Sequence, residues 1–255
     1  LCPQPVNETV MQSMSTAVRS GRAEMVFALP FLVMVPVALW LGKMNETHAV
    51  RPKDETLRSE SLGSILKNAL RDRDYRLLVI SFATCGFNMS IIESHLFSQY
   101  MSYGIPGRTA SLTLTVYGIA TMLGAVAVGF LGTRFQMKNV LGCVYAIRIF
   151  ISLGFLFLPK TTVFAFAATA LLGISGDATV PPTSGIVSRK FDAEKMAVLY
   201  GFTLIGHQIG AFASSNLGGM LVKLGMGYEP LWLINMILAA IAASASFAIR
   251  KDVMQ

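Results

Sequence analysis

The sequence predicts an all-α membrane protein, and three observations lead to this fold class. Seven long apolar runs fill the 255 residues, and six of them follow one another closely. Each run is close to the roughly 20 residues that a helix needs to cross a hydrocarbon core, and lipid admits only helices or closed barrels as spanning structures. The runs are too long and too evenly apolar for barrel strands. Only 14% of the residues are charged, against about one quarter in soluble domains.

The order of segments along the chain gives its organisation. Residues 1–22 are polar and begin with neither a Met nor the basic-then-apolar order of a signal peptide, so we expect a truncated N-terminus. One transmembrane helix is predicted at 23–43, and a charged central loop at 44–76 separates it from a six-helix region at 77–250. The six predicted spans of that region are 77–100, 109–131, 139–158, 161–187, 196–222 and 231–249.

The central loop becomes periodic near its end. Apolar residues there follow the i, i+3, i+4, i+7, i+8 spacing of an amphipathic helix, namely Leu62, Ile65, Leu66, Ala69 and Leu70. Ser59 and Ser61 are candidate N-caps for this helix. Because it is too short to span, two arrangements are open. It lies on the membrane surface near anionic headgroups, or it is a linker helix docked on the bundle.

The basic residues indicate the orientation of the spans. Fifteen are expected on the side of the central loop: Lys43, Arg51, Lys53, Arg58, Lys67, Arg71, Arg73, Arg76, Arg134, Lys138, Arg189, Lys190, Lys195, Arg250 and Lys251. Five are expected on the other side: Arg19, Arg22, Arg108, Lys160 and Lys223. This bias predicts that the central loop and the C-terminus are cytoplasmic. The plasma (inner) membrane is the expected location. The net charge of +7 therefore reflects topology and does not indicate a nucleic-acid partner.

A short motif follows the second of the six spans. The stretch 129–138 reads Gly-Phe-Leu-Gly-Thr-Arg-Phe-Gln-Met-Lys, and it resembles the loop signature Gly-x-x-x-Asp-Arg-x-Gly-Arg-Arg of the major facilitator superfamily. Gly129, Arg134 and Lys138 match that signature, whereas Thr133 stands where an Asp is usual. The missing carboxylate puts in doubt the cytoplasmic ion-pair latch that the family forms there.

Four further stretches resemble one bacterial branch of that superfamily, the monocarboxylate and oxalate/formate type. They are 85–96, 180–187, 200–212 and 216–219. The resemblance implies that 77–250 is the C-terminal half of the fold, built from two inverted three-helix repeats, and that 23–43 is the sixth span. In such transporters the substrate binds near the bilayer midplane between two six-helix halves. The expected partner is therefore the N-terminal half, which this chain lacks.

Three polar side chains are expected near mid-membrane, where a charged group is costly and thus a candidate for function: Arg148, His207 and Gln208. Arg148 offers a planar fork that can hold a substrate carboxylate bidentately. A structural ion pair with Asp177, or a packing role, is the alternative for Arg148. His207 is a candidate for proton coupling or for an interhelical hydrogen bond.

The first of the six spans carries further candidates, because the resemblance makes it a cavity-lining helix. Asn88 and His95 are candidate substrate-binding residues there. Glu93 lies only two residues from His95 and is expected on a different face. Glu93 and Asp177 join His207 as candidates for proton coupling.

Two backbone features of the later spans bear on movement. Pro181 and Pro182 remove two backbone donors and are expected to kink or break their helix, which leaves carbonyl groups free for substrate or water. Glycines on the second and fifth of the six spans permit close helix approach, either for static packing or for sliding. They are Gly118, Gly124, Gly129, Gly206, Gly210, Gly218 and Gly219.

These features together predict a secondary active transporter that moves a small solute by alternating access. The resemblance implies a monocarboxylate or other small organic anion as substrate, with H⁺ as the candidate coupled ion. A non-transporting receptor or scaffold with the same fold is the alternative. A membrane enzyme is disfavoured because His48, His95 and His207 lie far apart and no nucleophile–base pair or metal-ligand motif is present. No cofactor or metal is expected, and the lipid bilayer is a partner throughout.

Overall fold

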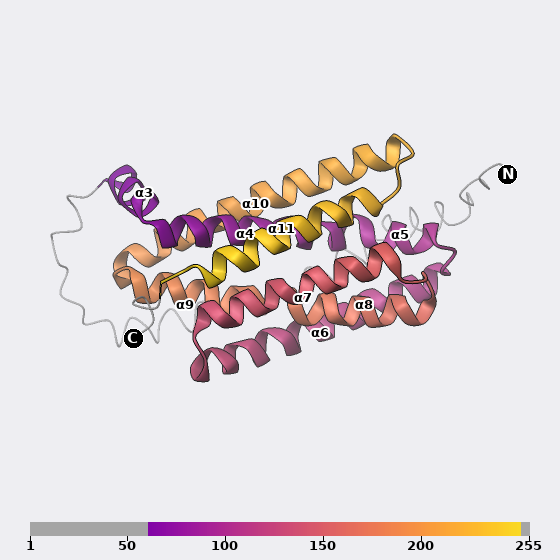
Figure 1. Cartoon of the computed structure of the whole chain (residues 1–255), viewed down its shortest axis with the longest axis horizontal. Coiled ribbons are helices and arrows are strands. Elements are labelled where there is room, and N and C mark those ends of the chain that lie inside the picture. Colours follow the sequence, from indigo (N-terminus) through magenta and orange to yellow (C-terminus); the bar gives the residue numbers. More distant parts are fainter. Residues whose placement is uncertain (1–60, 251–255) are drawn as a thin grey trace, which may run out of the picture. The chain divides into compact units, whose positions relative to one another are not determined.

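The computed structural model describes residues 61–250, except for the side chains of residues 193 and 194 (Figure 1). The chain divides into two units, Leu1–Ser59 and Glu60–Gln255, and the described residues belong to the second. The polar segment 1–22, the span predicted at 23–43 and most of the central loop lie outside the described residues.

The end of the central loop forms helix α3, Leu62–Arg71. Ser61 caps it, since its hydroxyl accepts a hydrogen bond from the Ser64 N–H at 3.3 Å. Ile65 and Ala69 are buried in a cluster that includes residues of the first and fifth spans, while Leu62 is exposed. The buried face is the one set by the helical spacing. It packs on the bundle as a docked linker helix would.

Six helical spans follow, each long and apolar enough to cross a membrane. The first combines α4 (Arg73–Ile91), η2 (Ile92–Leu96) and α5 (Phe97–Ser102), and the second and third are α6 (Gly107–Arg134) and α7 (Met137–Phe157). The fourth combines α8 (Thr162–Ser175), η3 (Asp177–Thr179) and α9 (Val180–Lys190), and the last two are α10 (Ala193–Lys223) and α11 (Glu229–Phe247). The predicted all-α membrane fold is confirmed, and the ends of the spans differ from the predicted ends by only a few residues.

The spans pack in three pairs. α4 packs chiefly on α10, α6 on α8, and α7 on α11, which pairs the first span with the fifth, the second with the fourth and the third with the sixth. If the first three spans are exchanged in order with the last three, the first–fifth pair becomes the fourth–second pair. The third–sixth pair maps onto itself. The packing therefore has the internal symmetry of two three-helix repeats.

Glycines make the two symmetry-related pairs possible. A Cβ on Gly86 of α4 would lie 1.8 Å from the His207 carbonyl oxygen of α10, and one on Gly210 would lie 1.9 Å from the Ala83 oxygen. In the α6–α8 pair, a Cβ on Gly124 would lie 2.2 Å from the Ile174 oxygen, and Gly173 is similarly close to α6. No larger residue fits these crossings, because backbone atoms cannot move aside.

The glycine prediction was correct in part. Gly124, Gly206, Gly210 and Gly218 face a neighbouring span closely. At Gly118, Gly129 and Gly219, apart from the glycine's own helix backbone, no described atom lies within 4 Å of the position a Cβ would take. Gly86 and Gly173 were not predicted, because nothing in the sequence shows which helix faces cross.

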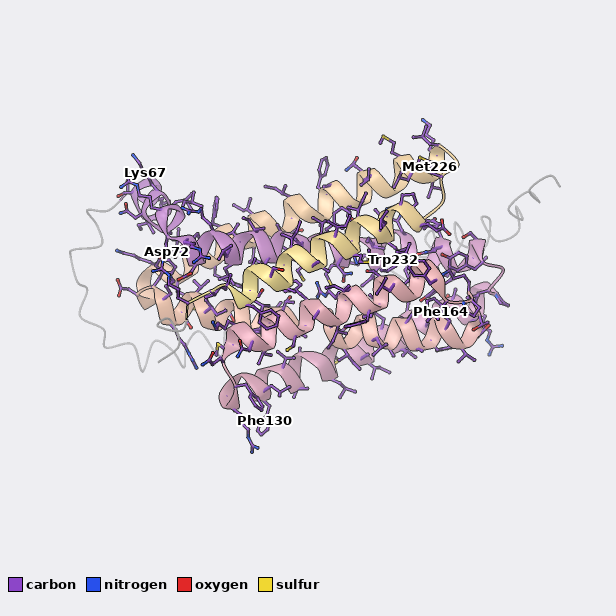
Figure 2. The ribbon with its side chains drawn as sticks, viewed as in Figure 1. Lys67, Asp72, Phe130, Phe164, Met226 and Trp232 are labelled. Atoms are coloured by element: carbon purple, nitrogen blue, oxygen red, sulfur yellow. The ribbon has the colours of Figure 1, made fainter. Side chains whose placement is uncertain are left out.

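Aromatic packing closes the end of the bundle opposite α3. The rings of Phe155 and Trp232 stack with centroids 3.8 Å apart, and the Trp232 indole N–H donates to Gln99 Oε1 at 3.0 Å (Figure 2). Tyr100 shares a 2.7 Å hydrogen bond with Thr169. These contacts join the first, third, fourth and sixth spans, and they satisfy the polar atoms that the aromatic residues bury.

Two of the six spans have little cover. Buried residues form 17% of the most apolar stretch of α6 and 11% of that of α10, against 44–61% in the other four spans. Large apolar side chains such as Met122 on α6 and Phe212 on α10 are each 72% exposed. Surface of this kind must meet lipid or further protein.

Candidate functional site

The fourth span is interrupted near its middle. Helix α8 ends at Ser175, a short 3₁₀ turn covers Asp177–Thr179, and α9 begins at Val180 with the two prolines in its first turn. Because the last turn of a helix leaves carbonyl groups unbonded, the break presents free acceptors inside the bundle. Asp177 lies at this break.

Arg148 of α7 fills those acceptors. Its side chain is 1% exposed, and its Nη2 donates to the Gly176 carbonyl at 2.8 Å and also to the Ser175 carbonyl. The guanidinium thus binds the carboxyl end of α8, where the helix dipole is negative. Asp177 is exposed, and within residues 61–250 no ion pair joins it to Arg148. The ion-pair alternative for Arg148 is therefore not found, and the contact is with backbone.

The rest of the guanidinium has no hydrogen-bond partner of standard geometry, although its central carbon lies 5.3 Å from the centroid of the Tyr145 ring and the Cys85 thiol is nearby. Nε and Nη1 are buried and make no hydrogen bond to the described residues. The side chains that influence Arg148 electrostatically are Cys85, Tyr145 and Tyr117, and none of them is a carboxylate. A carboxylate can bind a guanidinium with two hydrogen bonds, either at Nε and Nη2 or at Nη1 and Nη2. Both arrangements use Nη2, so a carboxylate can bind Arg148 in this way only if Nη2 releases one of its carbonyls.

Further polar groups without partners lie on the neighbouring spans. Asn88 on α4 is 1% exposed, and neither its Oδ1 nor its Nδ2 has a hydrogen-bond partner among the described residues. On the same helix, one turn before Asn88, the Cys85 thiol lies 3.1 Å from the Thr179 hydroxyl of the fourth span. The Thr183 hydroxyl of the fourth span is also buried and unpaired in the described chain. Buried polar atoms of this kind usually meet water or a ligand.

Tyr117 of α6 connects the charged candidates. Its hydroxyl is influenced by Asp177, Arg148 and Glu93, and it donates to the sulfur of Met89 at 3.3 Å. Asp177 and Glu93 are exposed. The two carboxylates and the guanidinium therefore lie within electrostatic range of one tyrosine, although they come from the first, third and fourth spans. Tyr117 was not among the predicted site residues.

The two intramembrane histidines differ in their contacts. His95 lies in the π-helical turn η2, with Nε2 3.2 Å from the Ser215 carbonyl, and its ring fills the space that a Cβ on Gly218 would need. It therefore forms the interhelical contact that was considered for His207. The His207 ring is half-buried and packs on Phe82 with centroids 4.9 Å apart. Gln208 is exposed on α10.

The three residues that match the loop signature have separate surroundings. Arg134 is exposed, with its guanidinium carbon 4.9 Å from the centroid of the Phe130 ring. Lys138 is buried, and its Nζ donates to the Ile249 carbonyl at 2.6 Å. This hydrogen bond satisfies a carbonyl just beyond the end of α11. Gly129 has no close neighbour in the described part of the chain.

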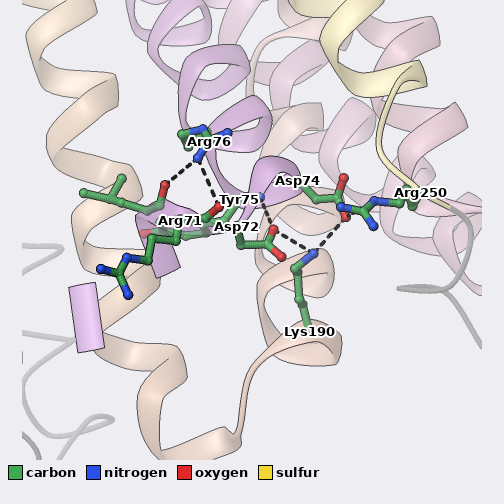
Figure 3. Close-up of polar contacts among 8 residues, drawn as sticks. Arg71, Asp72, Asp74, Tyr75, Arg76, Lys190 and Arg250 are labelled. Atoms are coloured by element: carbon green, nitrogen blue, oxygen red, sulfur yellow. Dashed lines mark hydrogen bonds and ion pairs between the residues drawn. The ribbon is translucent and has the colours of Figure 1, made fainter. Parts of the chain in front are cut away.

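A cluster of charges at the α3 end of the bundle was missed by the sequence analysis (Figure 3). Lys190, the last residue of α9, lies 2.8 Å from Asp72 Oδ1 and 2.8 Å from Asp74 Oδ2, and Arg250 Nε lies 3.7 Å from Asp74. Asp74 is only 2% exposed. Burial raises the pKa of the Asp72 carboxyl, but hydrogen bonds from Lys190 and from the Tyr75 N–H outweigh this and lower it below its usual value. No sequence signal could have joined residues 116 positions apart.

Comparison with known proteins identifies the family. The family model described as Major Facilitator Superfamily matches residues 16–215 and 78–253. The chain belongs to this superfamily. A curated relative, the uncharacterized MFS-type transporter YcxA of Bacillus subtilis (strain 168), is 23% identical over 223 residues, which cover 83% of this chain and 53% of that protein. The chain thus spans about half the length of this relative.

Membership has direct consequences for class and fold. The protein is an integral, multi-pass membrane protein of a transporter family, rather than a member of an enzyme family. Its six spans form one half of the family's fold, as predicted.

Between residues 61 and 250 no group of three or more His, Cys, Asp or Glu side chains is arranged to hold a metal ion.

Proposed function

We propose that this chain supplies the C-terminal half of a secondary transporter that moves a small solute by alternating access. Two observations support this. The spans α6 and α10 are largely uncovered, as they would be if a second six-helix half packed against them. The chain also spans only about half of the related transporter. The substrate would then lie at the face shared by the two halves, near mid-membrane.

The proposed substrate class is a small organic anion such as a monocarboxylate. The observation that carries it is Arg148, a fully buried cation with two unpaired donor atoms and no carboxylate partner among the described residues. An uncompensated charge in a membrane protein is expensive, and a bound anion would compensate it. The unpaired amide of Asn88 offers a further donor.

The geometry suggests how such an anion would bind. Nη2 stays on the carbonyls of the helix break, which fixes the plane of the guanidinium, while Nε and Nη1 remain for the substrate. An anion that instead took a bidentate edge would have to displace one carbonyl, and would thereby loosen the contact between α7 and the fourth span. Substrate binding would then be coupled to the broken helix.

Coupling to protons is the second part of the proposal. Asp177, Glu93 and Arg148 all act electrostatically on the Tyr117 hydroxyl. While they are ionised, they repel an anion from this region. Protonation would remove that repulsion, so that proton and anion would bind together. His207 remains a candidate because it is half-buried near Cys85, whereas His95 is engaged with the Ser215 carbonyl.

An uptake assay of the complete protein in proteoliposomes tests the substrate class. We expect labelled small carboxylates to accumulate, and neutral sugars and amines not to. Arg148→Lys keeps the charge but loses the planar donor array, and a hydrogen bond to a charged group contributes ~1.5–3 kcal/mol, so carboxylate uptake should fall about tenfold or more. The matched control is Arg108→Lys, at an exposed position in the first turn of α6. Near-normal uptake by the Arg148→Lys variant at equal membrane abundance would contradict anion binding at this residue.

A further inference from the structure

A buried thiol of the first span contacts the turn that Arg148 also binds. Cys85 of α4 is 2% exposed, and its Sγ lies 3.1 Å from the Thr179 hydroxyl at the end of the 3₁₀ turn. Arg148 binds the start of the same turn, since its Nη2 donates to the Gly176 carbonyl at 2.8 Å. Because Gly176 directly precedes this three-residue turn, the thiol and the guanidinium meet at one short stretch of the fourth span.

The thiol is the closest source of negative charge for Arg148. Of the side chains that act on the guanidinium, Cys85 acts most strongly, through its charge and as a hydrogen-bond acceptor. The buried donors Nε and Nη1 have no other acceptor among the described residues, and an ion pair needs proximity rather than the geometry of a hydrogen bond. Tyr145 presents its ring to the guanidinium, while its hydroxyl donates to the Ser81 carbonyl at 2.6 Å. A thiol also releases its proton more readily than a phenol.

The ionisable groups around Cys85 come from three neighbouring spans. They are Arg148 and Tyr145 on α7, His207 and Tyr200 on α10, and Asp177, which is exposed at the helix break. The ionisable residues of the other elements packed on this part of α4 lie at helix ends, namely Glu229 at the start of α11 and Arg189 and Lys190 at the end of α9. On α4 and its continuation the next one is Glu93, two turns further along. A guanidinium is always charged, whereas an imidazole is mostly neutral near pH 7, so Arg148 is the constant cation of this set.

We propose that the Cys85 thiolate is the counter-ion of Arg148 in the empty site, and that a substrate carboxylate replaces it there. The inference rests on the proposed function, because it assigns a proton-binding group to the same site. Replacement leaves the thiolate without its cation, and a lone buried anion is costly. The sulfur therefore takes a proton from the water that reaches the site: an S–H bond forms, and no group is oxidised or reduced. One proton thus enters with each carboxylate.

This role differs from that of the exposed carboxylates. Asp177 and Glu93 repel the anion while they are ionised and so affect its approach. Cys85 instead exchanges places with the anion at the guanidinium. Serine is close to cysteine in size but does not ionise, so Cys85→Ser removes the counter-ion with little change in packing.

The ultraviolet absorbance of the thiolate, measured on the purified complete protein without a carboxylate, tests the ion pair. At neutral pH the wild type should show a thiolate band that Cys85→Ser lacks. Cys143→Ser, at an exposed position of α7, is the matched control and should keep the band. Arg148→Gln should remove the band, whereas Arg148→Lys, which keeps the charge, should retain it.

Two outcomes of this measurement would overturn the proposal. One is an identical absorbance of the wild type and Cys85→Ser, which would show that the thiol is protonated in the empty site. The other is a band that is lost in His207→Gln and kept in Arg148→Gln, which would make the imidazole the partner cation. The first comparison does not depend on whether an Arg148 variant folds.

Added lactate, a small monocarboxylate, tests the exchange in the same protein. The band should decrease as lactate binds, and calorimetry in buffers of different ionisation enthalpy should find about one proton taken up per lactate bound. In Cys85→Ser the proton count should fall to near zero. Lactate that binds without a change in the band, or with the same proton count in Cys85→Ser as in the wild type, would overturn the exchange. A protein that binds no carboxylate would contradict the proposed function and the exchange together, whereas the band of the empty site still decides the ion pair.

Discussion

Arg148 has two sides with different surroundings. Nη2 binds the carbonyls at the end of α8, and Nε and Nη1 make no hydrogen bond in the described chain. A buried cation costs several kcal/mol unless it is compensated, and the negative end of a helix dipole compensates it only in part. One side of the residue therefore stabilises the helix break. The other side has no hydrogen-bond partner in the described chain, and it is where we propose that the anion binds.

Asp177 supplies the prediction at this scale. Asp177→Asn keeps the shape and a hydrogen-bonding group but cannot bind a proton, so the pH dependence of carboxylate uptake should become flatter while substrate exchange at constant pH is largely kept. The measurement is uptake by the complete protein across a pH series. Asp192→Asn is the matched control, because Asp192 is exposed at the N-cap of α10. An unchanged profile in the Asp177→Asn variant would move the coupling role to Glu93 or His207.

Among the elements, α9 is held in an unusual way. The break at residues 176–179 separates it from α8, so the helix ladder no longer fixes its position. Its far end is attached instead by Lys190 to Asp72 and Asp74 at the start of the first span, with Arg250 nearby (Figure 3). Asp74 is buried and one of its oxygens, Oδ1, has no partner. The charge cluster thus ties the end of α9 to the first span, in addition to the packing of Ile186 and Val187 in the core.

Removing the Lys190 ammonium should loosen that attachment. Lys190→Met leaves the buried Asp74 carboxylate without its closest partner, and an unsatisfied buried group costs about 1–3 kcal/mol, so the protein should unfold at a lower temperature. The measurement is thermal unfolding of the purified protein in detergent. Arg189→Met, at the exposed neighbouring position, should leave the unfolding temperature unchanged. Equal values for the two variants would show that the cluster contributes nothing to stability.

The pH dependence of this difference follows from Asp72. Since its folded pKa is lowered, its contribution is complete above the unfolded value of about 3.9 and is lost as the pH falls through the folded value. The wild type and the Lys190→Met variant should therefore become more alike in stability as the pH falls below about 4. Below that pH, a difference as large as the one at neutral pH would contradict this account.

For the whole molecule, six spans place their connections alternately at two ends. The described basic residues gather at the end that carries α3, the α6–α7 hairpin and the last residues before the C-terminus (Figure 1). These are Lys67, Arg71, Arg73, Arg76, Arg134, Lys138, Arg189, Lys190, Lys195 and Arg250. Arg108, Lys160 and Lys223 lie at the other end. We propose on this basis that the α3 end is cytoplasmic.

Cysteine labelling tests the orientation. In a background with Cys2 and Cys143 replaced by Ser, cysteines at the exposed positions Gln136 and Arg189 should react with an impermeant thiol reagent only from the cytoplasmic side. Cysteines at the exposed positions Arg108 and Leu224 should react only from outside. Labelling of Gln136→Cys and Arg108→Cys from the same side would rule out the alternating arrangement. Cys85 is buried and can remain.

A structural feature could be predicted from the sequence where the residues that determine it lie close together along the chain. The six spans, the helix at Leu62–Arg71 and an interruption near Pro181 follow from local properties of the chain. Apolar length decides whether a segment crosses lipid, helical spacing decides which face is buried, and a proline removes its own backbone donor. None of these requires a neighbour from elsewhere in the sequence.

The tertiary structure alone decided the partners. Arg148 binds carbonyls 27 and 28 positions away and not Asp177, His95 makes the interhelical contact considered for His207, and Lys190 meets Asp74 across 116 positions. The amino-acid sequence fixes that such groups are costly in a membrane and must be compensated. Which group compensates which depends on the rotation of each span about its axis, and that is set only when the glycine crossings bring the helices together.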